Sequence, residues 1–190
     1  LVQNLKSIFF PQNVFADRSC WDFSNFNSVR LSKEYMDSAL RQQTNILNLY
    51  KQRLELIVKL CRQSGISPVF MTQPCIAGDS MQECIKPSVD FHEFMNHENA
   101  QLFWLKLRMY NEVTKRVALI SGVPCIDLAT KMPKDPVYFY DLIHFTNEGA
   151  RKVAEIVDDG LTNFLAEKYS AYLKHREQQN PIESALLATK

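Results

Sequence analysis

Hydrophobic and polar residues alternate with a helical period over three long stretches, residues 32–64, 98–121 and 146–167. In each stretch apolar residues recur at spacings of three, four and seven, which predicts a helix with one buried face. The expected inner-face residues are Leu40, Leu47, Tyr50, Leu54, Ile57, Val58 and Cys61 in the first stretch, Leu102, Leu105, Met109, Val113, Val117 and Ile120 in the second, and Ala150, Val153, Ile156, Val157, Leu161 and Leu165 in the third.

The ends of these stretches carry residues that commonly begin or end helices. Ser32 and Thr146 precede the first and third stretches, where a side-chain oxygen can accept from the N–H groups of the first turn. Gly65 and Gly122 follow the first and second stretches, where a helix end favours a residue that adopts positive φ.

Two short apolar runs predict β-strands. The run "PVFMTQP" contains a strand at residues 69–72, and "VPCIDL" contains one at residues 123–128. Helices and strands that alternate in this order indicate an α/β fold with a parallel sheet and flanking helices. Two parallel strands are too few for an independent sheet, and residues 1–31 show no strand period, so we expect further strands from outside this chain.

Length and composition indicate one globular domain over residues 1–190. The chain is 46% hydrophobic and 23% charged, which is ordinary for such a domain. We assign residues 32–167 to its core and 168–190 to a C-terminal tail. The net charge of +1 gives no electrostatic argument for nucleic acid, and no apolar run is long enough to predict a transmembrane segment. The chain begins at Leu1 without Met or a signal-peptide pattern, so we expect a processed product or part of a longer protein.

The five cysteines cannot all pair within the chain. Cys75 and Cys84 bracket the loop "CIAGDSMQEC", either as a disulfide or as two thiols, and the residues leave both open. A disulfide would favour an extracytoplasmic or secreted location. The segment "HEFMNH" places His92 and His97 five residues apart, which separates them around a helix and argues against a zinc site.

The motif "DLIHFTNEG" carries the candidate chemistry, because Asp141 lies three residues before His144 in one loop. A carboxylate that accepts from Nδ1–H fixes the imidazole tautomer and leaves the other nitrogen as a general base. The loop follows a strand of the predicted sheet, and sites in such sheets lie outside the carboxyl ends of the strands. The other interpretation is a loop aspartate that caps a turn beside a surface histidine.

The pattern D-x-x-H-x-T-x-x-G resembles the last sequence block of the SGNH, or GDSL, hydrolase family. The order of "PVFMTQP", a long helix, "VPCIDL" and the Asp-His loop resembles the C-terminal half of that family, over residues 32–167. The resemblance implies a flavodoxin-like parallel sheet with flanking helices and hydrolysis of carboxylic esters, with His144 as the base and Asp141 orienting it. It implies no cofactor, and as substrate a small-molecule ester, an O-acylated glycan or a lipid.

The sequence departs from the family at the nucleophile. Family members carry their serine in a G-D-S motif directly after the first strand, whereas Gly78-Asp79-Ser80 lies on a loop after a later strand. We therefore expect the nucleophile on an N-terminal half of the same protein or on a cleaved partner chain. The alternative is a non-catalytic SGNH-like module that lacks the nucleophile and binds a glycan, lipid or protein.

Overall fold

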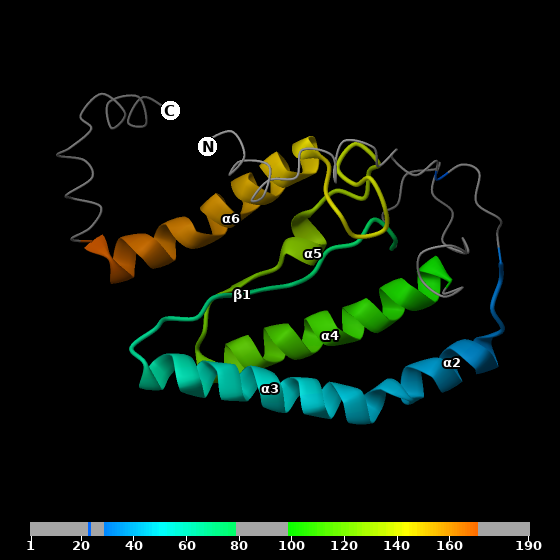
Figure 1. Ribbon diagram of the computed structural model, residues 1–190, viewed down its shortest axis with the longest axis horizontal. Helices are drawn as coiled ribbons and strands as arrows, with labels where there is room; N and C mark the ends of the chain where they lie inside the picture. Colours follow the sequence, from blue (N-terminus) through cyan, green and yellow to red (C-terminus); the bar gives the residue numbers. More distant parts are fainter. Residues whose placement is uncertain (1–22, 24–28, 79–98, 171–190) are drawn as a thin grey trace, which may run out of the picture.

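The computed structural model describes residues 23, 29–78 and 99–170 and has a mixed α/β architecture that is mostly helical (Figure 1). Two strands form a small parallel sheet, in the register Phe70 to Cys125 and Met71 to Ile126. The elements, in chain order, are α2 (Lys33–Arg41), α3 (Gln43–Gln63), β1 (Phe70–Met71), α4 (Ala100–Ser121), β2 (Cys125–Ile126), α5 (Leu128–Lys131) and α6 (Asn147–Lys168). The predicted parallel pair of strands is confirmed.

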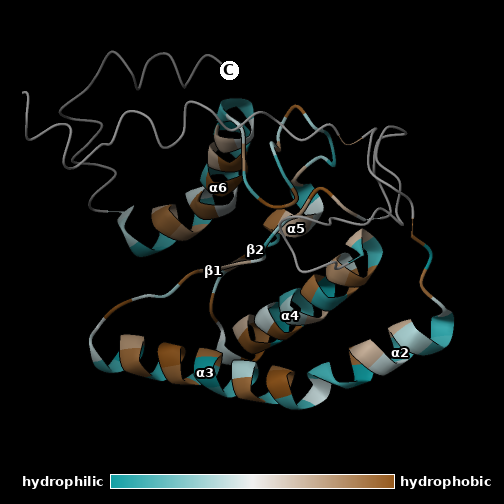
Figure 2. Ribbon diagram, turned by 45° about the vertical axis from the view of Figure 1, so that its right-hand side comes forward, coloured by the Kyte–Doolittle hydropathy of each residue, from teal (hydrophilic) through white to brown (hydrophobic). Residues whose placement is uncertain are grey.

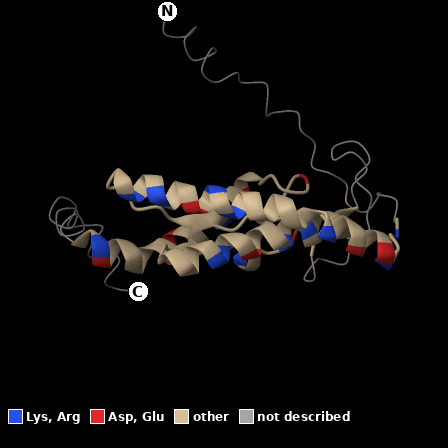
Figure 3. Cartoon of the chain, turned by 90° about the horizontal axis from the view of Figure 1, so that it is seen from below, with Lys and Arg blue, Asp and Glu red and all other residues tan. Residues whose placement is uncertain are grey.

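The strand pair lies between α4 and α6, as Figures 1 and 2 both show. Helix α4 packs against α3 and both strands, whereas α6 packs against β2 and α5. Basic and acidic residues are interspersed along the helices, as the blue and red segments of Figure 3 show. Apolar packing connects the layers through the two core clusters described below.

The predicted helix ends are confirmed. The hydroxyl of Ser32 accepts from the N–H of Tyr35, and that of Thr146 accepts from the N–H of Gly149. Gly122 ends α4 with φ +59°, a left-handed conformation in which a side chain is strained. These local signals depend on neighbouring residues only, which explains why the sequence reveals them.

The first predicted helix is divided in two at Gln42, between α2 and α3. Side chains compete there for the backbone carbonyls: the Thr44 hydroxyl donates to the Arg41 carbonyl at 2.9 Å, and the Gln43 amide donates to that of Ala39. Such local bonds loosen the regular ladder and bend a helix. The short helix α5 was not predicted, because four residues are too few to show a period.

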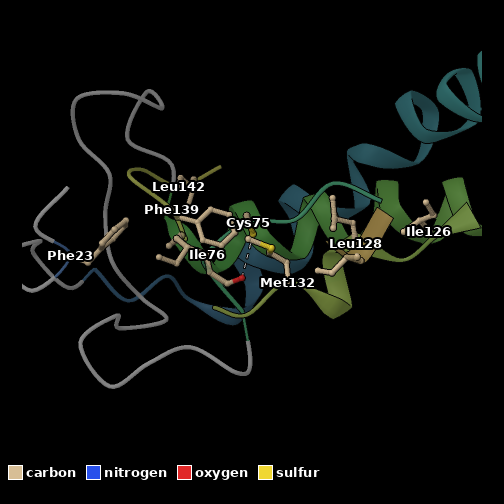
Figure 4. Close-up of a cluster of buried hydrophobic side chains, with 11 residues drawn as sticks. Phe23, Cys75, Ile76, Ile126, Leu128, Met132, Phe139 and Leu142 are labelled. Carbon is tan, nitrogen blue, oxygen red and sulfur yellow. Dashed lines mark hydrogen bonds between the residues drawn. The ribbon is translucent and has the colours of Figure 1, made fainter. Parts of the chain in front are cut away.

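Two clusters of buried side chains form the core. One lies between α3 and α4 and includes Leu54, Val58, Phe70, Val117, Ala118 and Val123. The other connects the segment after β1 to β2, α5, α6 and the loop before α6, and Figure 4 shows Phe139, Leu142 and Ile76 gathered beside Cys75 in this cluster.

Four residues predicted to be buried, Ile57, Ile120, Ala150 and Leu165, are exposed instead. Ile57, Ile120 and Leu165 expose 45%, 68% and 39% of their surface. On α4 the polar residues Asn111 and Thr114 occupy buried positions that the apolar pattern did not include. When a helix has apolar residues on two sides, its sequence does not show which side will be buried against another element.

Candidate functional site

A tight loop closed on itself precedes α6 and carries both candidate residues. Phe139 and Phe145 form an isolated antiparallel bridge. Inside it, the N–H of Tyr140 donates to the carbonyl of His144 at 3.1 Å. Residues 141–144 therefore form the tip of a hairpin-like loop, which brings the two ends of the D-x-x-H motif together.

The structure places the Asp141 carboxylate against the His144 ring, as the sequence predicts. Oδ2 of Asp141 lies 2.7 Å from Nδ1 of His144. Oδ1 accepts from the backbone N–H groups of Ile143 at 3.0 Å and His144 at 2.8 Å. The carboxylate is buried and makes three hydrogen bonds, so its position is fixed by the loop that carries it.

The imidazole ring of His144 is held on one side and open on the other. Tyr140 stacks on the ring, with centroids 5.6 Å apart and planes 9° apart. The side chain exposes 45% of its surface. Because a carboxylate only accepts, Nδ1 carries the proton of the neutral ring and Nε2 keeps its lone pair. This is the tautomer that a general base needs.

The loop is anchored to the rest of the protein by buried contacts. Phe139 and Leu142 are fully buried, and the carbonyl of Leu142 accepts from the N–H of Ile76 at 3.0 Å. Gly149 lies so close to the loop that a Cβ added there would be 2.0 Å from the carbonyl oxygen of Tyr138. The segment after β1 and the first turn of α6 thus hold the loop from both sides.

Among the residues that the structure describes, none brings a nucleophile to this pair. Within the described residues, no hydroxyl is hydrogen-bonded to Nε2 of His144. Gly78 packs against the Trp104 ring, with φ +143°. Asp79 and Ser80, the rest of the G-D-S tripeptide, lie outside the described residues, as do Cys84, His92 and His97.

Cys75 has a free thiol, so the disulfide alternative is not realised here. Its Sγ donates to the Ala77 carbonyl at 3.3 Å, and burial raises the pKa of the thiol to about 11. At neutral pH this side chain is a small neutral core residue.

A second polar region, which the sequence did not single out, lies at the carboxyl ends of both strands. A cavity of about 480 Å³ opens there between α4 and the α5 segment. We refer to it as the strand-end cavity, lined by Gln73, Cys75, Trp104, Leu107, Arg108, Asn111, Glu112, Lys115, Asp127, Ala129, Thr130, Lys131, Met132, Pro133 and Lys134. Asp141 and His144 are not among these residues.

Asn111 from α4 holds the chain where β1 ends. Its side-chain oxygen accepts from the N–H of Gln73, and its amide donates to the carbonyl of Gln73, both at 2.8 Å. In the sequence, the signal that could have revealed Asn111 is a polar residue within the apolar face of a predicted helix. The side chain of Gln73 donates to the carbonyl of Pro74 at 3.1 Å.

Asp127 connects the ends of the two strands. Its Oδ1 accepts from the Thr72 hydroxyl at 2.8 Å, and its Oδ2 accepts from Thr130 at 3.0 Å and Lys115 at 3.4 Å. Burial alone would raise the pKa of Asp127, but these hydrogen bonds and the lysine charge outweigh it and lower the pKa. Asp127 therefore stays ionised as a structural acceptor.

The described residues contain no cluster of three or more His, Cys, Asp or Glu that could hold a metal ion. No helix in the described ranges has the length and apolar composition to cross a bilayer. No family model, curated protein or solved structure matches the chain.

Proposed function

We propose that this chain supplies the acid-base part of an SGNH-type carboxylic ester hydrolase, with His144 as general base and Asp141 as the acid that orients it. The observation that carries the proposal is the 2.7 Å contact between a buried carboxylate and Nδ1 of a half-exposed imidazole. A surface histidine beside a capping aspartate would not require the carboxylate to be buried or the ring to be stacked on Tyr140.

In the proposed reaction, Nε2 of His144 takes the proton of a serine hydroxyl as its oxygen bonds to the ester carbonyl carbon. The imidazolium is stabilised by Asp141 and returns the proton to the alcohol oxygen when the bond between acyl carbon and alcohol breaks. A water molecule then releases the acid from the serine by the same two proton transfers. The described residues provide the base and its orienting acid, and the serine comes from elsewhere.

The edge of β1 that faces away from β2 is where we propose that further strands bind. The N–H groups of Phe70 and Thr72 donate to the carbonyls of Pro124 and Ile126, so the N–H of the intervening Met71 points to the opposite side. No described strand pairs with that side, and Met71 exposes 51% of its surface. A parallel strand added there would end at the same edge as Gln73, next to the segment that holds the Asp-His loop.

Helix α3 supports the same proposal through an outer apolar stripe. We define this stripe as Ile46, Leu49, Leu56, Ile57 and Leu60, which expose between 45% and 53% of their surface. Hydrophobic positions recur along the length of α3 in Figure 2. Exposed apolar side chains in such a row mark a contact surface. An N-terminal half or a cleaved partner chain that extends the sheet would complete a flavodoxin-like fold and bring the serine.

The substrate class follows from the family resemblance: a small-molecule ester, an O-acylated glycan or a lipid. A Ser-His-Asp mechanism needs no cofactor, because the serine is the nucleophile and the histidine moves both protons. Solvent reaches the half-exposed ring of His144, which the second, hydrolytic half of the reaction requires.

The test is turnover of a short-chain ester by the purified native protein. His144→Ala should lower kcat by about three orders of magnitude or more, and Asp141→Asn by somewhat less. Asparagine keeps an oxygen for the N–H groups of Ile143 and His144 but presents an amide to Nδ1, which forces the wrong tautomer. Glu148→Gln, an exposed carboxyl on the first turn of α6, is the control and should retain full activity. Full activity of His144→Ala would reject the assignment.

The second candidate is a non-catalytic SGNH-like binding module. It is favoured by the lack of a described hydroxyl at Nε2 of His144. A fluorophosphonate probe separates the two functions, because it labels only an activated serine. Labelling that His144→Ala abolishes supports the hydrolase, whereas a folded native protein that takes no label supports the binding module.

A further inference from the structure

The strand-end cavity has the position and size of a ligand site, independently of the Asp-His pair. It lies where Gln73 follows β1 and Asp127 follows β2, outside the carboxyl ends of two parallel strands. Open α/β sheets bind ligands at this edge. Its volume of about 480 Å³ lies in the range that holds a small organic molecule.

The charges that line the cavity are unbalanced. Four basic side chains line it, Arg108, Lys115, Lys131 and Lys134, against the two acidic side chains Glu112 and Asp127. Lys115 bonds to both acids, at 2.5 Å to Glu112 and 3.4 Å to Asp127, so one cation is shared between the two carboxylates. The other three cations have no carboxylate partner within the part of the chain that the structure describes.

Arg108 is held by an aromatic ring rather than by an acid. Its guanidinium carbon lies 4.9 Å from the centre of the Trp104 ring. Gly78 also contacts that ring, and a Cβ there would be 3.0 Å from Nε1 of Trp104. A cation–π contact uses none of the guanidinium N–H groups, so these stay available to a carboxylate or phosphate, which arginine can bind in bidentate geometry.

Lys134 brings a cation into the inner wall of the cavity. Its ammonium donates to the Cys75 carbonyl. Burial lowers the pKa of Lys134, opposed by the nearby Cys75 sulfur. A bound anion would offset that desolvation, because opposite charge favours the protonated amine.

The cavity is rigid where it meets the strands. Asn111 clamps both backbone groups of Gln73, and the Thr72 hydroxyl both donates to Asp127 and accepts from the N–H of Ala129 at 2.8 Å. The polar groups at the strand ends are thus satisfied, and the unpaired cations are the groups that remain for a ligand.

We propose that the strand-end cavity binds a small organic oxyanion, a carboxylate or a phosphate, through Arg108, Lys131 and Lys134. The site does not include Asp141 or His144, so the proposal does not depend on the hydrolase assignment.

Calorimetric titration of the full chain with inorganic phosphate and with acetate tests the site and distinguishes the two oxyanions. We expect saturable binding of at least one of them. Arg108→Gln should weaken it about tenfold, since a charge-assisted bidentate contact is lost. Arg116→Gln is the matched control: it removes the same charge from the same helix, outside the cavity, and should change the affinity less than twofold. In a Trp21→Phe background, the fluorescence of Trp104, then the only tryptophan, should change with the same affinity.

Three results would overturn the proposal. The first is no saturable binding of either anion to the folded chain. The second is an equal loss of affinity in Arg108→Gln and Arg116→Gln, which would indicate diffuse attraction by surface charge. The third is equal binding of neutral glycerol, which would show that the cavity does not select for charge.

Discussion

At the residue scale, the Asp141 carboxylate determines the geometry of the candidate site. It accepts from two backbone N–H groups and from the His144 ring within four residues of chain. The same side chain therefore shapes the loop and selects the tautomer. This double role explains why a short motif predicts the contact: the spacing alone brings the acid to the ring once the loop closes.

Among the glycines, Gly149 leaves the least room for a side chain. A Cβ there would be 2.0 Å from the Tyr138 carbonyl oxygen, which belongs to the backbone and cannot rotate away. We expect Gly149→Ala to lower the free energy of unfolding by about 3 kcal/mol, measured by chemical denaturation.

Gly160→Ala is the control for that substitution, because both glycines lie in α6. The nearest atom to its added Cβ would be Cγ1 of the Ile126 side chain at 3.0 Å, which can move. The gain in helix propensity of about 1 kcal/mol should offset that contact. Equal destabilisation by the two substitutions would show that the contact between Gly149 and the loop is not decisive.

At the element scale, the end of β1 is positioned by α4 through one side chain. Asn111 bonds both backbone groups of Gln73, as a neighbouring strand would. We expect Asn111→Ala to cost about 1–2 kcal/mol of unfolding free energy, because two backbone groups lose their partners. Hydrogen exchange of the Gln73 amide should become faster in this variant.

The adjacent residue provides the control for Asn111. The Glu112 side chain is mostly exposed, and we expect Glu112→Ala to change the stability by less than about 0.5 kcal/mol. Unchanged exchange of the Gln73 amide in Asn111→Ala would contradict a clamp at the end of β1.

At the scale of the whole molecule, the outer stripe of α3 tests whether these apolar residues stabilise this chain itself or only a larger assembly with additional strands. Because Leu56 and Leu60 are half exposed, we expect the double substitution Leu56→Lys and Leu60→Lys to change the stability of this chain by less than about 1 kcal/mol. Leu54→Lys, on the buried side of the same helix, should unfold it.

Denaturation of the two variants measures this difference. Comparable damage by both would show that the outer stripe is already packed within the chain. In a protein that carries the proposed additional strands, the Leu56 and Leu60 substitutions should become strongly destabilising, because the stripe would then be buried.

Local sequence determined the elements of this protein and the contact within its Asp-His motif. Three signals depend only on neighbours along the chain: helical spacing, the caps at Ser32 and Thr146, and the glycines after the helices. They can therefore be recognised in the sequence before the fold is known. The prediction of two short parallel strands was correct for a similar reason, since their apolar runs are bounded by prolines and polar residues. The break at Gln42 was missed because the apolar pattern continues across it, from Leu40 to Leu47.

Only the tertiary structure decided which apolar faces are buried and which polar residues meet. The pattern of α3 allows two apolar sides, and contact with α4 selected the side of Leu54 and Val58 over that of Ile57. Asn111 and Gln73 are 38 residues apart, and Thr72 and Asp127 are 55 apart, so no local spacing predicts their hydrogen bonds. The strand-end cavity exists because parallel strands bring their carboxyl ends, and the residues that follow them, to one edge.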